Sequence, residues 1–405
     1  MLDTSKPLFR LKDLFVFSGF KFLESFLDQE NVEIQLKRTK KTGMCPKCNK
    51  RCSSIKDRSI RTIRDLDIVN SKCCIKFTQF RISCKCGYTG MEKLDFAETY
   101  ARHTKRFEER VAILCKAMTI KDVAKETGLH WETVKNIDKR EAQKYVMNLS
   151  EVSPTRIGVD EIAYEKGHKY LTIVRDVDLG KVIWVEQDRK KETFDKFFQE
   201  LGKEKSMNIS IAAMDMWDPF IASVKENTNA EIVFDKFHIA KHINEAVDKT
   251  RKQEFAKADD EERKLMKKKR FLILSRKKNL TRAKKESLKD LMTKNDTLYK
   301  AYLLKEQILD IMDEEDENKA LKRFAKWFDN ILLSQLPHFA GVAKMLQKYS
   351  YGILNYFKHK ITNAASEGFN TKINVIKRRA YGFRDLEYFR LKIIQLCGVS
   401  TPTNP

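Results

Sequence analysis

The sequence of 405 residues lacks any run of about 20 consecutive apolar residues, the length that a helix needs to cross a bilayer. We therefore expect no membrane-spanning segment. We also expect no secretion signal, because the early apolar stretch LFRLKDLFVF is interrupted by Arg10, Lys12 and Asp13. No internal repeat is present, which argues against a repeat protein.

Acidic residues are too few to balance the basic ones, with 57 Asp and Glu against 80 Lys and Arg and a net charge of +23. Such an excess informs on the partners of a protein and not on its fold. Nucleic acid is the expected partner, and an anionic membrane surface is the alternative. Hydrophobic residues make up 42% of the chain, so folded cores are expected, and the length suggests about two to four domains.

Seven of the nine cysteines fall within residues 45–86. Because their total is odd and no secretion signal precedes them, metal binding is favoured over disulfides. The motifs CPKC (45–48) and CKC (84–86) flank two strand-like runs, SIRTIRDLDIV and CCIKFTQFRIS. This pattern predicts a zinc ribbon with one closed, structural Zn²⁺ bound by Cys45, Cys48, Cys84 and Cys86. The second motif has an unusual one-residue gap, so Cys52, Cys73 or Cys74 could replace a ligand, and reduced buried thiols are the alternative.

The segment TIKDVAKETGLHWETVKNI (119–137) has the pattern of a helix-turn-helix. Ala124 is small enough for two helices to cross, Gly128 suits the turn, and Val134 should face the core. The second helix should begin near His130 or Trp131. It would present four polar residues to the DNA major groove: Glu132, Thr133, Lys135 and Asn136. An ordinary helical hairpin is the alternative.

After residue 155 the pattern changes to that of a mixed sheet covered by helices. Strands are predicted at 156–164, 169–177, 181–187, 209–214 and 230–234, with helices at 190–202 and 219–227 and a long helix from about 236. Residues 245–360 should be all-helical. Within them, 251–290 carry 16 Lys and Arg against 7 Asp and Glu, which suits either a solvated or a DNA-facing surface. Helices at 362–379 and about 384–397 close the chain.

Two aspartates end neighbouring strands of this predicted sheet. Asp160 lies in the first strand and Asp215 ends the fourth, and a βββαβ order places these strands side by side. Asn363, Glu367, Asn370 and Asn374 share one face of a later helix, so Glu367 could be a third ligand. Oxygen ligands without nearby cysteine predict two Mg²⁺ or Mn²⁺ ions for phosphoryl transfer. For each acid alone, a helix cap or a surface ion pair is the alternative.

Four segments are similar to the ISL-three family of bacterial insertion-sequence transposases, which have an RNase-H-like Asp-Asp-Glu core. These segments are GVDEIAYEKGHKYLTIV, AMDMWDPFI, IVFDKFHIAKHINEAVDK and AASEGFNTKINVIKRRAYGFR. The resemblance implies a metal-binding catalytic triad of Asp160, Asp215 and Glu367, and a helical insertion between the last two. It also implies cleavage of element ends followed by strand transfer. Asp235 and His238 fit an Asp-x-x-His pattern of such enzymes, although a strand-end cap and a packed histidine would explain them equally well.

The resemblance implies four domains in five segments: a strand and zinc-ribbon domain (1–98), a helix-turn-helix (99–150), a catalytic core (151–250 and 359–405) and a helical insertion (251–358). Double-stranded DNA is the expected partner, bound by a homodimer in the bacterial cytoplasm. Phosphates near the triad could contact the basic side chains Lys372, Lys377, Arg378, Arg379 and Arg384. Trp217 and Trp327 could stack on an unpaired base, although both are more often core residues. A non-catalytic DNA-binding regulator and another RNase-H-like DNA nuclease remain the alternatives.

Overall fold

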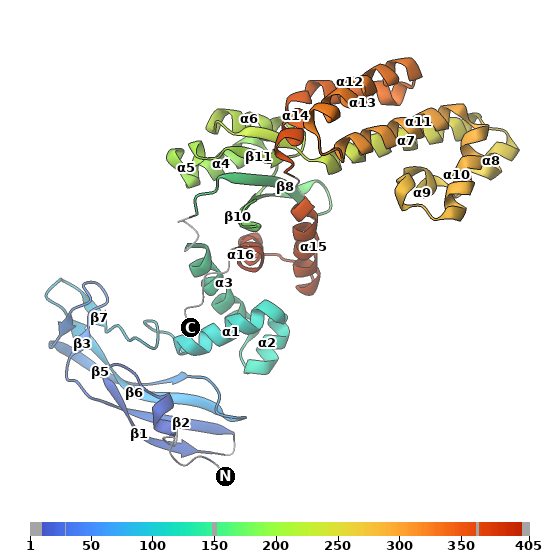
Figure 1. Ribbon diagram of the computed structural model, residues 1–405. Coiled ribbons are helices and arrows are strands. Elements are labelled where there is room, and N and C mark those ends of the chain that lie inside the picture. Colours follow the sequence, from blue (N-terminus) through green and yellow to red (C-terminus); the bar gives the residue numbers. More distant parts are fainter. Residues whose placement is uncertain (1–9, 29, 148–151, 362–363, 399–405) are drawn as a thin grey trace, which may run out of the picture. The chain divides into compact units, whose positions relative to one another are not determined.

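The computed structural model describes residues 10–28, 30–147, 152–361 and 364–398, without the side chains of 364–367. The chain forms two compact units, Met1–Lys144 and Tyr145–Pro405 (Figure 1). Helices and mixed sheets both occur, which confirms a multi-domain α/β protein. No helix in the described ranges is long and apolar enough to cross a bilayer.

The first unit begins with a five-stranded sheet. At its centre, β2 (Asn31–Arg38) and β6 (Lys72–Ser83) pair in parallel. β1 (Phe20–Leu27) pairs with β2, whereas β5 (Ile55–Arg64) and β7 (Thr89–Met91) pair with β6. Alternate residues of β2 and β6 are buried, so one face of the sheet carries the core. The strand-like runs between the cysteine motifs correspond to β5 and β6.

Two short elements flank this sheet. The 3₁₀ helix η1 (Leu11–Leu14) precedes β1. The hairpin of β3 (Gly43–Met44) and β4 (Arg51–Cys52) contains the CPKC motif in its loop. The loop therefore brings the first pair of cysteines close together in space.

Three helices complete the first unit: α1 (Lys105–Ala117), α2 (Ile120–Thr127) and α3 (Trp131–Met147). The Thr119 side chain caps α2 by accepting a hydrogen bond from the Asp122 amide. Gly128 ends α2 with φ of 68°, a left-handed conformation that glycine adopts without a Cβ clash. Val134 is fully buried and packs against side chains of α1 and α2. Two helices thus lie where the sequence predicts them.

The second unit contains a five-stranded sheet in the order β10-β9-β8-β11-β12. β8 (Arg156–Glu165), β9 (Lys169–Asp176) and β10 (Lys181–Gln187) are antiparallel, whereas β11 (Ile211–Met214) is parallel to β8 and to β12 (Glu231–Phe234). This arrangement confirms the predicted βββ-α-β-α-β order and the pairing of the first and fourth strands. All four residues of β11 are buried, as expected for a central parallel strand.

Helices cover both faces of this sheet. α4 (Lys191–Leu201), α5 (Lys203–Met207) and α6 (Asp218–Asn227) lie along the chain between the strands, and Phe194, Phe198 and Phe220 join the core on one face. α15 (Ala364–Arg379) and α16 (Leu386–Cys397) supply Ile373, Phe389 and others to a second core on the opposite face. α15 and α16 therefore pack on this sheet, although they follow its last strand by more than a hundred residues in the sequence.

Within the described residues between β12 and α15 every regular element is a helix, as predicted for residues 245–360. It contains α7 (Lys236–Lys257), α8 (Asp260–Met266), α9 (Arg270–Leu274), η3 (Lys277–Asn279), α10 (Arg282–Lys294), α11 (Asp296–Met312), α12 (Glu317–Ser334), α13 (Pro337–Lys348) and α14 (Ser350–His359). In Figure 1, α7 and α11 run side by side away from the sheet. Trp327 is only 1% exposed and donates its indole N–H to the Leu304 carbonyl, so the proposed base stacking by Trp327 is wrong.

α14 covers the edge strand β12. The Asn355 side chain donates a hydrogen bond of 2.9 Å to the Ile232 carbonyl of this strand. Gly352 faces Phe234 so closely that a Cβ atom there would lie 2.4 Å from the ring. The helical segment and the sheet are therefore joined at a contact that requires glycine.

Replacing Gly352 by alanine is expected to destabilise the second unit by about 1–3 kcal/mol, because the Phe234 ring has to shift. Urea unfolding followed by circular dichroism would measure the loss. Gly341→Ala is the matched control, since Gly341 also lies within a helix and its Cβ would meet nothing within 4 Å. The control should be neutral or stabilising by up to about 1 kcal/mol. Equal effects of the two substitutions would contradict the close contact.

Candidate active site and cysteine cluster

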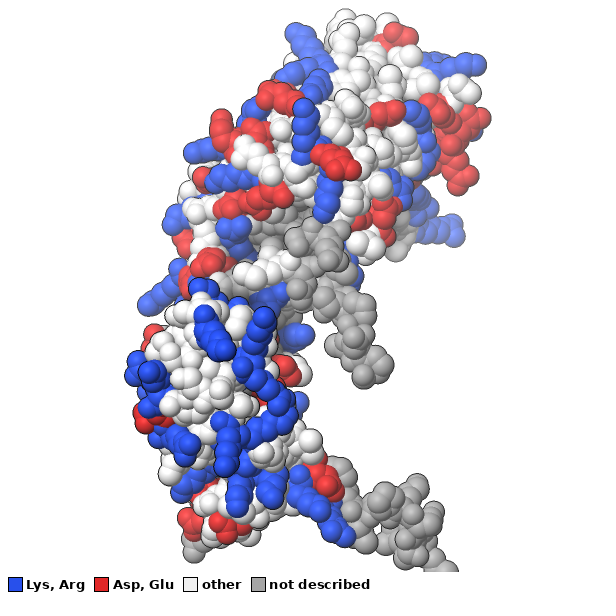
Figure 2. All heavy atoms as spheres, turned by 90° about the vertical axis from the view of Figure 1, so that its left-hand side faces the viewer, with Lys and Arg blue, Asp and Glu red and all other residues white. Residues whose placement is uncertain are grey.

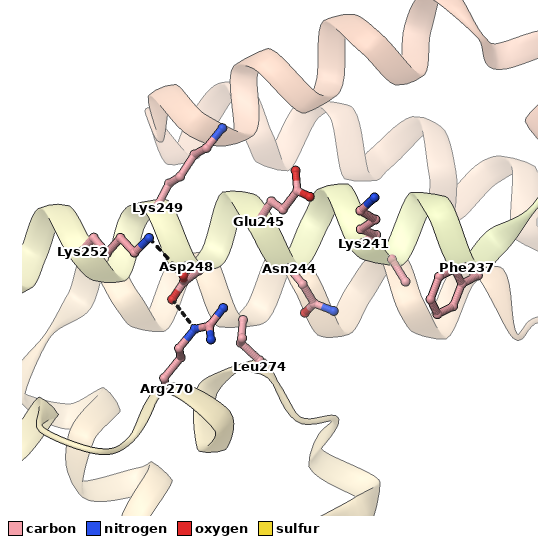
Figure 3. A pocket seen from close by; sticks show the side chains of 10 residues that line it. Phe237, Lys241, Asn244, Glu245, Asp248, Lys249, Lys252, Arg270 and Leu274 are labelled. Carbon is pink, nitrogen blue, oxygen red and sulfur yellow. Dashed lines mark hydrogen bonds and ion pairs between the residues drawn. The ribbon is translucent and has the colours of Figure 1, made fainter. Parts of the chain in front are cut away.

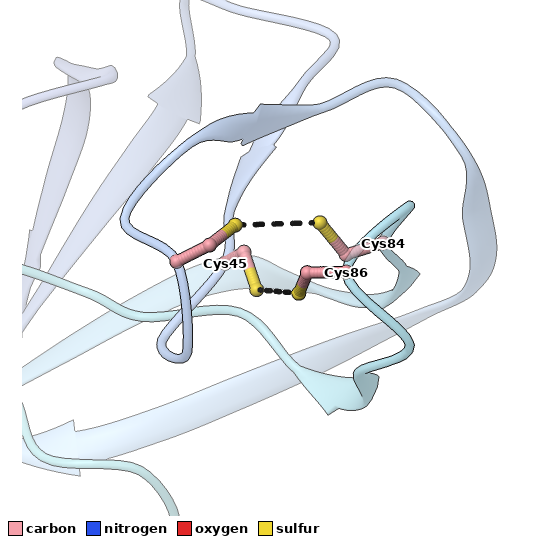
Figure 4. A group of neighbouring side chains, drawn as sticks. Cys45, Cys84 and Cys86 are labelled. Atoms are coloured by element: carbon pink, nitrogen blue, oxygen red, sulfur yellow. Dashed lines mark hydrogen bonds between the residues drawn. The ribbon is translucent and has the colours of Figure 1, made fainter.

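Four cysteines of the first unit converge at one point (Figure 4). The sulfur atoms of Cys45, Cys48, Cys84 and Cys86 all lie within 4.8 Å of one another. Two pairs are 3.6 Å apart, Cys45 with Cys86 and Cys48 with Cys84. In the described part of the chain this is the only group of three or more His, Cys, Asp or Glu ligand atoms that close together. The group has the donor set and closed arrangement of a structural zinc site.

The electrostatics of the cluster favour a thiolate at Cys45. Burial alone would raise its pKa, but hydrogen bonds from the backbone of Cys48 and Lys47 lower the pKa of the Cys45 thiol to about 7. The three alternative cysteines lie outside the cluster. Cys52 donates its S–H to the Ser83 carbonyl. Burial raises the pKa of Cys73 on β6 to about 12. Burial also raises the pKa of Cys74.

The predicted DNA-reading residues lie on the first turns of α3. Glu132 and Asn136 are exposed, and Thr133 and Lys135 are half-buried. Trp131, at the start of the helix, is 54% exposed. Because Val134 and Ile137 are buried on the other side, these polar residues form the outer face of α3.

The first unit is also strongly basic. Residues 1–144 carry 31 Lys and Arg against 19 Asp and Glu. On the face shown in Figure 2, Lys and Arg predominate over the first unit, whereas both signs are mixed over the second. A positive surface of this kind is suited to the phosphate backbone of DNA.

In the second unit, Asp160 and Asp215 line one cavity of about 880 Å³, which we name the acidic cavity. β11 pairs with β8 through Ala212 with Ile157 and Ala213 with Gly158, and two further steps in this register bring Asp215 opposite Asp160. Side chains in register on adjacent strands point to the same face. The cavity is also lined by Glu161, Arg189, Asp235, His238, Arg276, Lys278, Asp313, Asn370, Thr371 and Asn374.

Asp160 is held by hydrogen bonds from two sides. Its carboxylate accepts one from the Glu161 amide at 2.8 Å and one from the Asn370 side chain on α15 at 2.9 Å. Burial nevertheless raises the pKa of Asp160, and the nearby charge of Asp215 acts in the same direction. A bound cation would relieve this cost, because it favours the ionised form.

His238 contacts Asp215, with Nδ1 2.9 Å from a carboxylate oxygen. Burial opposes protonation of the ring, but the hydrogen bond and the charge of Asp215 raise the pKa of His238 above its usual value. Asp235 caps α7 by accepting a hydrogen bond from the Phe237 amide. The Asp-x-x-His pattern therefore combines a helix cap with a contact to the second aspartate, and both residues line the acidic cavity.

Arg175, which the sequence analysis missed, is a buried cation close to these acids. It is 3% exposed and lies opposite Gly158 in the pairing of β9 with β8. A Cβ atom at Gly158 would lie 2.6 Å from the Arg175 guanidinium, so glycine leaves the room that this side chain occupies. Burial lowers the pKa of Arg175, whereas the charges of Asp160 and Asp235 act against this shift.

Glu367 lies on α15, but its side chain is outside the described part, as are Thr362 and Asn363. Asn370 and Asn374 follow it on the same helix and line the acidic cavity. Residue 367 precedes these two by three and seven positions, the spacing of one helical face.

The basic residues after Glu367 divide into two groups. Lys372 and Lys377 donate hydrogen bonds to the carbonyls of Leu396 and Tyr164, and their phosphate contacts stay a prediction. Arg378 and Arg384 are exposed and Arg379 is half-buried. Trp217 is partly exposed, and Arg189 lies over its ring at 4.8 Å, so only Trp217 of the two predicted tryptophans borders the site.

Asp313, at the end of α11, connects the helical segment to the acidic cavity. Burial alone would favour its protonation, but hydrogen bonds from Lys278 and Arg276 lower the pKa of Asp313 to about 2. Lys236, at the start of α7, lies 3.4 Å from the same carboxylate. Nothing in the sequence links residues this far apart, so this part of the wall cannot be predicted from the sequence.

Replacing Asp313 by asparagine should lower the free energy of unfolding by about 1 kcal/mol at pH 7. The pKa shift allows up to about 2.5 kcal/mol, but the carboxylate is 35% exposed and solvent screening reduces this value. Because the folded-state pKa lies below the unfolded one, the difference should be complete above pH 4 and shrink towards pH 2. Urea unfolding at pH 7 and pH 3 would measure it. Asp329→Asn, at an exposed position of α12, should show no such difference.

Comparison with known proteins identifies relatives of both units. A family model described as "Transposase" matches residues 157–393, and one described as "Helix-turn-helix domain of transposase family ISL3" matches residues 92–142. The transposase for insertion sequence element IS1001 of Bordetella parapertussis is 31% identical over 367 residues, covering 89% of this chain and 90% of the relative. The transposase for insertion sequence element IS1557 of Mycobacterium tuberculosis is 26% identical over 393 residues, covering 89% and 87%.

Proposed function

Because the chain belongs to the transposase family ISL3 and is therefore a DNA transposase, we propose that Asp160, Asp215 and Glu367 catalyse its cleavage and transfer of DNA strands. The observation that supports this most is the acidic cavity. Two aspartates from neighbouring strands line it, and α15, which carries Glu367, forms one wall through Asn370. The order of strands with α15 across their ends suits an RNase-H-like core.

The residues around the cavity fit divalent metal ions. Carboxylates and amide oxygens are the donors that Mg²⁺ and Mn²⁺ prefer, and no cysteine lines the cavity. We assign Asp160, Asp215 and Glu367 as ligands of two such ions. Bound ions of this kind activate a water or a 3′-hydroxyl and neutralise the leaving oxygen. His238 orients Asp215, Asn370 orients Asp160, and Arg189, Arg276 and Lys278 attract the phosphate backbone into the cavity.

The first unit supplies the DNA recognition. One Zn²⁺ on Cys45, Cys48, Cys84 and Cys86 would stabilise the loops at the end of the sheet, since metal binding there is coupled to folding. The outer face of α3, with Glu132, Thr133, Lys135 and Asn136, would read the terminal inverted repeats in the major groove. We infer a homodimer in the DNA complex, because two element ends are joined in one reaction. We infer that the zinc ribbon lies within residues 1–98 and that the helix-turn-helix that reads DNA lies within 99–150. The catalytic core would consist of residues 151–250 with 359–405, and the helical insertion of residues 251–358.

Cleavage of end-labelled duplexes that carry the flanking inverted repeats would test this proposal. We expect nicks at the repeat ends in Mg²⁺ or Mn²⁺ and none in EDTA. Tight binding without cleavage would favour the non-catalytic regulator. Cleavage that follows DNA shape and not the end sequence, without strand transfer, would favour another nuclease.

A further inference from the structure

A groove of about 410 Å³ runs along α7, from Phe237 in its first turn to Lys252 (Figure 3). Arg270 and Leu274 of α9 form its opposite side. Phe237, Ala240 and Lys241 line both this groove, which we name the α7 groove, and the acidic cavity. A chain that leaves the acidic cavity past Phe237 therefore enters the α7 groove.

Phe237 is an unusual residue at this junction, because 57% of its side chain is exposed. Its backbone amide is bound by the Asp235 cap, and its ring contacts His238 edge to face at 5.6 Å. Both contacts hold the ring in place beside the cavity. An exposed phenylalanine ring is unfavourable in water, and stacking an unpaired base on it would remove the ring from water.

Cations outnumber carboxylates along the rest of the groove. Its lining contains Lys241, Lys249, Lys252 and Arg270 against Glu245 and Asp248. Asp248 is already paired with Arg270 at 3.2 Å and with Lys252 at 3.6 Å, as the dashed lines in Figure 3 show. Among the described residues no ion pair involves Lys241 or Lys249, and both point to the same side of α7 in Figure 3. These two ammonium groups are available to phosphates.

We propose that the α7 groove binds a single-stranded segment of DNA beside the cleaved bond, with Phe237 stacking on its first unpaired base. This inference rests on the proposed function. Phe237 and Lys252 are fifteen residues apart, so the groove spans about 22 Å of helix. An exposed ring followed by a line of cations is what single-stranded nucleic acid needs. The segment belongs either to the element end or to the flanking DNA.

The test uses the full-length protein and element-end duplexes with 2-aminopurine on either side of the cleaved bond. Binding of the unmodified protein should raise the fluorescence at one of the two positions, which identifies the source of the strand. Phe237→Ala should abolish most of this rise while fluorescence anisotropy shows affinity within about threefold, since the remaining contacts persist.

The lysines are tested by the salt dependence of binding to DNA with an unpaired flank. Lys241→Gln combined with Lys249→Gln should reduce the slope of log affinity against log salt by about 1.4, which is about 0.7 for each lost phosphate contact. Lys257→Gln is the matched control, because Lys257 lies on α7 outside the groove and pairs with Glu254.

A wild-type fluorescence rise in Phe237→Ala, together with a wild-type salt slope in the protein with Lys241→Gln and Lys249→Gln, would overturn the α7 groove assignment and leave the proposed function intact. Failure of the unmodified protein to bind or cut element ends would instead overturn the proposed function. The two failures are therefore distinguishable.

Discussion

Replacing Asp215 by asparagine is expected to lower metal-dependent cleavage of element-end DNA by about 10²–10³-fold or more. Asparagine keeps the shape of the side chain and its place opposite Asp160, but it removes the negative charge that a divalent cation needs. DNA affinity should be unchanged, since the residues that we assign to reading lie on α3. Quantified nicking of labelled duplexes, with anisotropy alongside, would measure both quantities.

Asp218→Asn is the matched control for this substitution. Asp218 lies three residues further on, at the start of α6, and its exposed carboxylate is bound by Lys348 and Tyr349 outside the acidic cavity. The control should cleave like the unmodified protein. If the Asp215→Asn protein cleaved DNA as well as the unmodified protein, Asp215 would not be a catalytic residue. The proposed metal binding by Asp160 together with Asp215 would then be wrong.

Loss of the cysteine cluster should have the largest effect on stability. Cys45→Ser is expected to abolish stoichiometric zinc and to unfold the loops that contain the cluster, because structural zinc contributes on the order of 10 kcal/mol to such folds. Atomic absorption would count one zinc per unmodified chain and less than half of that in the variant. DNA binding by the first unit should fall with it.

Cys74→Ser is the corresponding control. Cys74 lies on β6 in the same sheet, but its sulfur is not part of the cluster. Its variant should keep its zinc and its DNA affinity. A zinc content of one in both variants would contradict the ligand set, and zinc absent from the unmodified protein would contradict the site itself.

Local patterns were sufficient to predict the sheet of the second unit. The apolar runs that end in Asp160 and Asp215 have the alternation and burial pattern of strands. The order of the elements along the chain then predicts that β8 pairs with β11. The hydrophobic periodicity of a sequence does not show which groups a side chain contacts. Trp327 could therefore be taken for a stacking residue, whereas its indole N–H is bound inside the helical segment.

The less predictable part of the site depends on contacts across long stretches of chain. Asp313, Arg276 and Lys278 reach the acidic cavity only because α11 and η3 fold back towards the start of α7. Arg175 is a buried cation at the end of an apolar run in β9, and its nearness to Asp160 depends on the antiparallel register of β8 and β9. Neither spacing nor composition indicates that these residues belong to the site. The close spacing of the cysteine pairs, in contrast, is sufficient to predict a metal site.

The distance along the chain between β11 and α15 has a consequence for synthesis. Asp215 leaves the ribosome 152 positions before residue 367, which is about 8–30 s at about 5–20 residues per second. During that time the sheet and the helical segment can fold, but the wall that contains Asn370 does not yet exist. A nascent chain therefore holds its two aspartates without the last helices.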